Sequence, residues 1–71
     1  MRYVTLVQVP GPGASSVEVS DETTVAQFVA NNNLSGKTII VDGEGIAPEN
    51  YGSVTLNTAT EIFATAAVKG N

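Results

Sequence analysis

The clearest helix signal in the chain begins at residue 24 and limits how the other residues can fold. Residues 24–27 read Thr-Val-Ala-Gln, which fits a capping box: the threonine hydroxyl accepts from the third helical amide and the glutamine reaches back to the cap. Val25, Phe28 and Val29 form one apolar stripe, and the asparagine run 31–33 ends the helix. A helix of two to three turns does not hold alone in water, so we expect it to pack on a sheet.

Extended segments precede this helix. Residues 3–9 are rich in β-branched and aromatic side chains and end at the Pro-Gly-Pro-Gly turn of residues 10–13. Residues 15–20 alternate polar and apolar side chains, which is the pattern of a half-buried strand. The two segments predict a β-hairpin with Val17 and Val19 facing the core.

Further extended segments follow the helix. Residues 37–41 contain three consecutive large apolar side chains, which predicts a central, well-buried strand. The Asp-Gly-Glu-Gly sequence of residues 42–45 predicts a turn. Residues 48–52 begin with proline and end with glycine, which is typical of a single helical turn, and Tyr51 within it is expected to pack beneath the sheet edge.

The end of the chain completes the predicted sheet. We expect a brief strand at residues 54–56, a last strand at 61–68 and a solvent-exposed tail at 69–71. The fold class is therefore α+β, with a mixed sheet of four to five strands and one helix packed across it. With 71 residues, we expect positions 1–71 to form a single domain.

The composition excludes most catalytic chemistry. A chain of this size has room for one thin core and not for an enclosed active site, and it contains neither Cys nor His. The acidic pairs at positions 21–22 and 42–44 are expected to be solvated, and the second lacks the twelve-residue spacing of a calcium loop. We therefore expect no enzyme activity, no cofactor and no metal site.

The charge balance bears on partners and location. Only Arg2, Lys37 and Lys69 oppose seven carboxylates, giving a net charge of −4, so we expect no nucleic-acid partner. No apolar run is long enough for a membrane span, and the start of the chain lacks the regions of a signal peptide. These features predict a cytoplasmic protein or a component of a virus particle. Eight Thr, five Ser and six Asn supply a neutral polar surface that is suited to contact with other proteins.

Several segments together resemble the β-grasp sulfur carriers of the ThiS/MoaD type. The likeness covers the helix start at residues 24–29, the strand and turn at 40–43, the short turn at 46–51, the start of the last strand at 60–63 and the tail at 66–70. The resemblance implies a β-grasp, or ubiquitin-like, fold. β-Grasp domains serve many roles on one frame, so the resemblance leaves the function open.

The tail is where this sequence departs from that family. The carriers end in Gly-Gly, whose terminal carboxylate is adenylated and converted to a thiocarboxylate or an isopeptide link, whereas this chain ends Lys69-Gly70-Asn71. Our first hypothesis is therefore a non-catalytic binding or structural module, such as a viral coat, decoration or accessory protein, that docks on a protein partner or larger assembly by its sheet edge or exposed face. The alternative is a sulfur carrier or ubiquitin-like modifier that acts through Gly70 after loss of Asn71. A third hypothesis, an acidic mimic of nucleic acid, requires the carboxylates to form a stripe.

Overall fold

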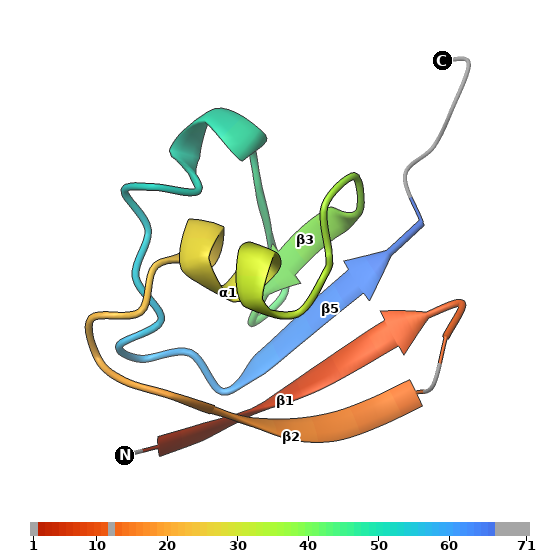
Figure 1. The fold of residues 1–71 in the computed structure, drawn as a ribbon, viewed down its shortest axis with the longest axis horizontal. Helices are drawn as coiled ribbons and strands as arrows, with labels where there is room; N and C mark the ends of the chain where they lie inside the picture. Colours follow the sequence, from red (N-terminus) through yellow and green to blue (C-terminus); the bar gives the residue numbers. More distant parts are fainter. Residues whose placement is uncertain (1, 12, 67–71) are drawn as a thin grey trace.

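The computed structural model describes residues 2–11 and 13–66 and shows one α-helix on a five-stranded mixed sheet (Figure 1). The predicted α+β class, with a single helix packed across a mixed sheet, is confirmed. In chain order the elements are β1 (Arg2–Val9), β2 (Gly13–Val19), α1 (Val25–Asn31), β3 (Thr38–Val41), β4 (Glu44–Ile46), a 3-10 turn (Pro48–Asn50) and β5 (Glu61–Thr65).

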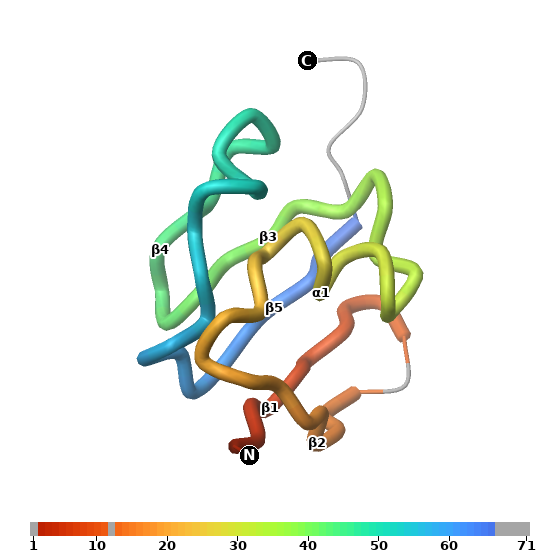
Figure 2. Tube along the Cα trace, turned by 60° about the vertical axis from the view of Figure 1, so that its left-hand side comes forward, coloured from red at the N-terminus to blue at the C-terminus, as the bar shows by residue number. Residues whose placement is uncertain are grey.

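The strand order across the sheet is β2-β1-β5-β3-β4. The predicted hairpin of β1 and β2 is present, and β3 and β4 form a second antiparallel pair. The last strand, β5, lies between the two pairs, parallel to β1 and antiparallel to β3. The first strand and the last strand are therefore neighbours in the interior of the sheet. The helix covers one face of the sheet only (Figures 1 and 2).

The predicted capping box starts α1. Thr24 Oγ1 accepts from the Gln27 backbone amide at 3.1 Å, and the Thr24 amide donates to Gln27 Oε1 at 3.0 Å. The apolar stripe of Val25, Phe28 and Val29 is buried, as predicted. After the helix the chain turns through Asn33, whose φ of 58° lies in the left-handed region that asparagine tolerates.

The core lies between α1 and the sheet face that it covers. Its strand residues are Val4, Leu6, Val19, Ile39, Ile62 and Ala64; Leu34, Leu56 and Ala59 enter it from the loops. Val17 packs against this cluster while remaining half-buried. Both valines of β2 therefore face the core as predicted, and Val19 is the more deeply buried of the two.

The prediction that residues 37–41 form the central, well-buried strand is wrong in part. The strand exists as β3, but β5 occupies the centre of the sheet. Of its three large apolar residues, only Ile39 is fully buried, whereas Ile40 and Val41 are half-buried. For Ile40 the reason is the sheet's one-sided cover: side chains alternate between faces, and nothing in the described chain lies over the face that Ile40 occupies. Val41 lies on the helix side and packs against the core, but it is the last residue of β3, next to the short edge strand β4.

Three predicted boundaries also differ. The turn at residues 42–45 is tighter than expected, because Glu44 and Gly45 already belong to β4. The brief strand at residues 54–56 is reduced to a single bridge between Thr24 and Thr55. β5 ends at Thr65, so Ala66 is not part of it, and residues 67–68 of the predicted last strand lie outside the described residues.

Candidate functional site: the open face of the sheet

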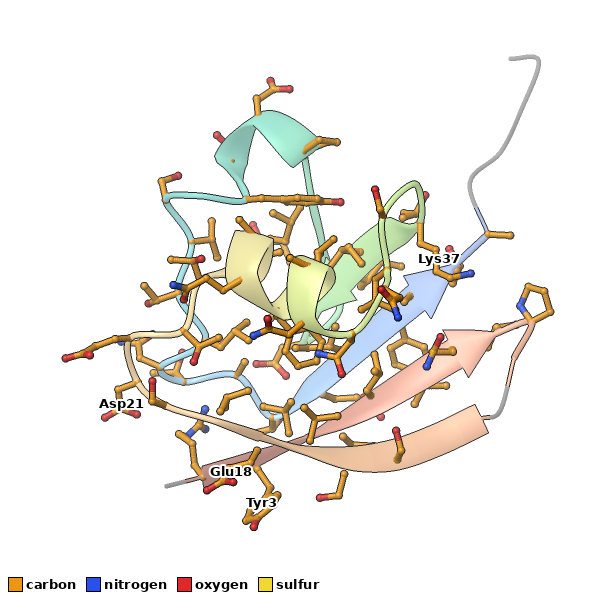
Figure 3. All side chains as sticks on the ribbon, viewed as in Figure 1. Tyr3, Glu18, Asp21 and Lys37 are labelled. Atoms are coloured by element: carbon orange, nitrogen blue, oxygen red, sulfur yellow. The ribbon has the colours of Figure 1, made fainter. Side chains whose placement is uncertain are left out.

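Several apolar side chains of the described strands lie on the sheet face opposite α1. Because successive side chains of a strand point to opposite faces, the burial of Val4 and Leu6 under the helix places Tyr3, Val7 and Val9 on the other side. Figure 3 shows Tyr3 directed away from the helix. We call this surface the open face.

One row of neighbouring residues crosses all five strands of the open face. The register aligns Ala14 with Val7, Val7 with Phe63, Phe63 with Ile40, and Ile40 with Gly45. Val7, Phe63 and Ile40 are half-buried, and they shield one another because neighbouring strands hold their side chains about 5 Å apart. The row is therefore a continuous apolar band, flanked at both ends by residues with little or no side chain.

Small uncharged side chains border this band. Thr5 and Ser16 are paired on one side of it, and Thr38 and Thr65 on the other. Two large apolar side chains are the most exposed to solvent: Tyr3, beyond Thr5, at 63%, and Val9, beside Thr65, at 51%. The open face thus carries small uncharged polar side chains arranged around an apolar centre.

The charges of the open face are both negative. Glu18 pairs with Tyr3 across the hairpin, and Glu61 pairs with Thr5. Figure 3 shows the side chain of Glu18 on the same side of the sheet as that of Tyr3. By strand alternation Arg2 belongs to the opposite face, so the described strands bring two carboxylates and no cation to the open face.

Of the acidic residues at positions 42 and 44, Asp42 is hydrogen-bonded to the start of β5. The carboxylate of Asp42 accepts from the Thr60 amide at 3.0 Å, the Thr60 hydroxyl at 2.9 Å and the Glu61 amide at 2.9 Å. Hydrogen bonds from Glu61 and then from Thr60 hold the pKa of Asp42 below its ordinary value of 3.8. Asp42 therefore joins the β3–β4 turn to the start of β5, a structural role that the sequence did not reveal.

The other acidic pair, Asp21 and Glu22, follows β2 and lies at the surface. Asp21 is 78% exposed and its carboxylate is 4.0 Å from the guanidinium of Arg2. Arg2 also donates to two backbone carbonyls, those of Leu56 at 2.5 Å and Ala59 at 2.7 Å. One of the chain's three cations is thus committed to fixing the loop that precedes β5.

A shallow groove on the helix side is a smaller candidate site. It encloses about 430 Å³ and lies between the end of α1 and the segment after β4. Tyr51 forms part of its wall and packs against the core, and partial burial raises the pKa of its hydroxyl. The other lining residues are Val29, Ser35, Gly36, Lys37, Thr38, Ile46 and Pro48. Lys37 is the single charged side chain among them, so the groove offers one fixed charge for orienting a ligand.

The residues of the predicted tail site, Lys69, Gly70 and Asn71, lie outside the described residues. Within residues 2–11 and 13–66, no three acidic side chains gather where they could hold a metal ion. No helix in the same part of the chain is long and apolar enough to cross a membrane.

Comparison with known proteins does not assign a family. No family model matches this chain, and no curated protein or solved structure is significantly similar to it. Function is therefore inferred from the open face and the strand order.

Proposed function

We propose that this chain is a β-grasp module that binds a protein partner or a larger assembly through its open face and performs no chemistry of its own. Two observations support the β-grasp assignment: the strand order β2-β1-β5-β3-β4 and the single helix that crosses one side of the sheet. The observation that carries the binding function is the apolar band formed by Val7, Phe63 and Ile40 across the uncovered face.

The chemistry of the open face favours protein over the other large partners. Threonine and serine around an apolar centre are cheaper to desolvate than charged groups. Glu18 and Glu61 repel phosphate, so the face does not suit nucleic acid or an anionic membrane surface. The partner that fits it is a protein surface with an apolar ridge and a basic group opposite these carboxylates.

The size of the open face indicates how such a partner binds. Five strands spaced about 4.8 Å apart span roughly 20 Å; β1, β2 and β5, of five to eight residues, are of similar length, whereas β3 and β4 have four and three residues. The flat area is then at most roughly 400 Å² on this side, no more than about half of one partner's share of a standard interface. We therefore propose a contact that is weak for one copy and that becomes stable when it is repeated in an assembly or supplemented by a second surface.

The experiment is site-specific photocrosslinking in the cells that encode the protein. A photoreactive residue at Thr65, on the open face, is compared with one at Ala30, on the exposed side of α1. The expected result is one dominant protein adduct from position 65 and none from position 30. The adduct partner is then purified, and its affinity for the wild-type chain is measured.

A matched pair of charge variants completes the test. Val9→Asp places a carboxylate on the open face at a side chain that is already 51% exposed. Asn57→Asp adds the same charge away from the face and retains the oxygen that accepts from Thr55. The proposal requires Val9→Asp to weaken binding about tenfold or more, with Asn57→Asp close to wild type. Equal adducts from positions 65 and 30, or equal affinity of the two variants, would refute it.

A second candidate function follows from the position of β5. β5 occupies the centre of the sheet, and Ala66 directly after it is hydrogen-bonded through its amide to the Val9 carbonyl at 3.0 Å. Residues 69–71 therefore follow within a few positions of the most firmly held strand, as a carrier or modifier tail requires. Intact mass spectrometry of the protein from its own cells tests this function. A species ending at Gly70, or one heavier by an oxygen-to-sulfur exchange, supports it, and unmodified full-length chain alone contradicts it.

A further inference from the structure

The outer edge of β2 is an exposed strand edge with few of the features that usually block pairing. β2 lies at the end of the strand order, and both backbone views show no other described segment beside it (Figures 1 and 2). It is seven residues long and reads Gly-Ala-Ser-Ser-Val-Glu-Val. Edge strands are commonly protected by lysine, proline or shortness, and β2 has none of the three, with Glu18 as its one charge. The opposite edge strand, β4, is three residues long.

The hydrogen bonds of β1 determine which groups of β2 point outward. The Thr5 amide donates to the Thr60 carbonyl, and the Val9 carbonyl accepts from the Ala66 amide, both at 3.0 Å. Odd-numbered residues of β1 thus direct their backbone groups toward β5. Because successive residues alternate in direction, the even-numbered residues of β1 direct theirs toward β2.

The register then assigns the outer edge residue by residue. The partners of the even-numbered β1 residues are Gly13, Ser15, Val17 and Val19, whose amides and carbonyls face β1. The remaining residues of β2 direct their amides and carbonyls away from the sheet, and they are Ala14, Ser16 and Glu18. Their side chains lie on the open face. The edge therefore offers three amide donors and three carbonyl acceptors at every second residue.

We propose that a second copy of this chain pairs with this edge, joining β2 to β2 in an antiparallel ladder centred on Ser16. In that register Ser16 faces its own copy and Ala14 faces Glu18, so all three outward residues of each chain are paired. Each of these facing pairs exchanges two backbone hydrogen bonds, giving about six across the two-fold axis.

Charge and the number of paired residues both favour this register over other registers of the β2–β2 ladder. Moving the centre by one residue in either direction leaves one outward residue of each chain unpaired, and centring on Glu18 would place two carboxylates opposite each other. In the proposed register each Glu18 lies opposite a methyl group, and the two carboxylates are about 14 Å apart. The two open faces then become one continuous surface of ten strands. Because each copy carries a net charge of −4, the pairing strengthens as salt screens the repulsion.

Single-cysteine variants test the pairing, since the chain contains no cysteine. In the proposed ladder the two Ser16 Cα atoms are about 5.5 Å apart, within the range that a disulfide spans. The two Ala14 residues are about 14 Å apart. Under mild oxidation Ser16→Cys is expected to form a covalent dimer at least about tenfold faster than Ala14→Cys.

A mixture of Ala14→Cys with Glu18→Cys is expected to form the mixed dimer in preference to either like pair. Equal rates at positions 14 and 16, or a preference for like pairs in the mixture, would overturn the proposal.

A reversible measurement supplies the second test. Ser16→Pro removes an outward amide that β1 does not use, and edge strands tolerate proline at such positions. Ser16→Ala keeps the amide and serves as the control. By sedimentation between about 0.01 and 1 mM, the range of weak contacts, wild type and Ser16→Ala are expected to dimerise more strongly as salt is raised. Ser16→Pro, folded by circular dichroism, is expected to dimerise at least about tenfold more weakly. A wild type that stays monomeric throughout, or a Ser16→Pro variant that dimerises like wild type, contradicts the proposal, and neither result bears on the open face as a docking site for another protein.

Discussion

Leu56 anchors the longest segment without regular structure, and its truncation should destabilise the whole domain. It is fully buried, although it lies in a loop between the 3-10 turn and β5. Its amide donates to the Thr23 carbonyl at 2.8 Å, and its carbonyl accepts from Arg2. Since the backbone is held from both sides, the loop cannot collapse into the space that Leu56→Ala would leave. The expected cost is therefore about 3–4 kcal/mol, in the upper half of the range for buried leucines.

That cost is a large part of the total stability. A chain of 71 residues is held by about 4–11 kcal/mol, and each kcal/mol shifts the midpoint of thermal unfolding by roughly 4–8 °C in a domain of this size. Leu56→Ala should thus lower Tm by roughly 10–30 °C. Val54→Ala is the control, because Val54 lies in the same loop but is only half-buried, and we expect it to cost about 1 kcal/mol.

Urea unfolding followed by circular dichroism and tyrosine fluorescence gives the two free energies, since the chain contains two Tyr and no Trp. If Leu56→Ala costs no more than Val54→Ala, the loop is not held in the way we infer. The backbone bonds to Thr23 and Arg2 would then not prevent its collapse.

Three further predictions concern polar contacts. The hydrogen bonds that lower the pKa of Asp42 stabilise the fold at neutral pH, and this contribution is lost as pH falls below the ordinary value of 3.8 toward the lower folded value. The urea midpoints of wild type and Asp42→Asn should therefore differ at pH 7, and the difference should shrink as pH falls below 3.8; a constant difference would contradict the assignment. Thr24→Ala removes the cap of α1 and should cost about 1 kcal/mol, measured by urea unfolding, whereas the exposed Ser53→Ala should cost little. Arg2→Met removes two charged hydrogen bonds to the carbonyls of Leu56 and Ala59 and should cost about 2–3 kcal/mol. Hydrogen exchange should show faster opening of residues 56–60. Unchanged exchange there would refute the inference that Arg2 holds this loop.

Local chemistry explains why much of the fold could be predicted from the sequence. The capping box at Thr24 and the apolar stripe of α1 involve residues three and four positions apart, so both can be recognised from the sequence alone. The β1–β2 hairpin is likewise local, with alternation on one strand and a glycine-rich turn between the two. The sequence located these elements to within a few residues.

The interactions that the sequence missed connect distant positions. Asp42 accepts from Thr60 and Glu61, eighteen and nineteen residues away, and Arg2 reaches Ala59 across 57 residues. An Asp-Gly dipeptide indicates a turn whether or not its carboxylate has such partners. The apolar run in β3 predicts a central, well-buried strand, and this is wrong in part because a sequence pattern does not reveal how many faces of a sheet are covered.

The candidate site likewise depends partly on composition, which the sequence shows, and partly on long-range pairing, which it does not. Sequence alone determined the composition: a small chain without Cys or His, with few cations and many uncharged polar side chains, which led us to look for function on the surface or at the tail. Tertiary structure decided which side chains form that surface, because the band of Val7, Phe63 and Ile40 exists only when β5 inserts between β1 and β3. These residues are far apart in the chain, and strand register, a property of long-range pairing, brings them together.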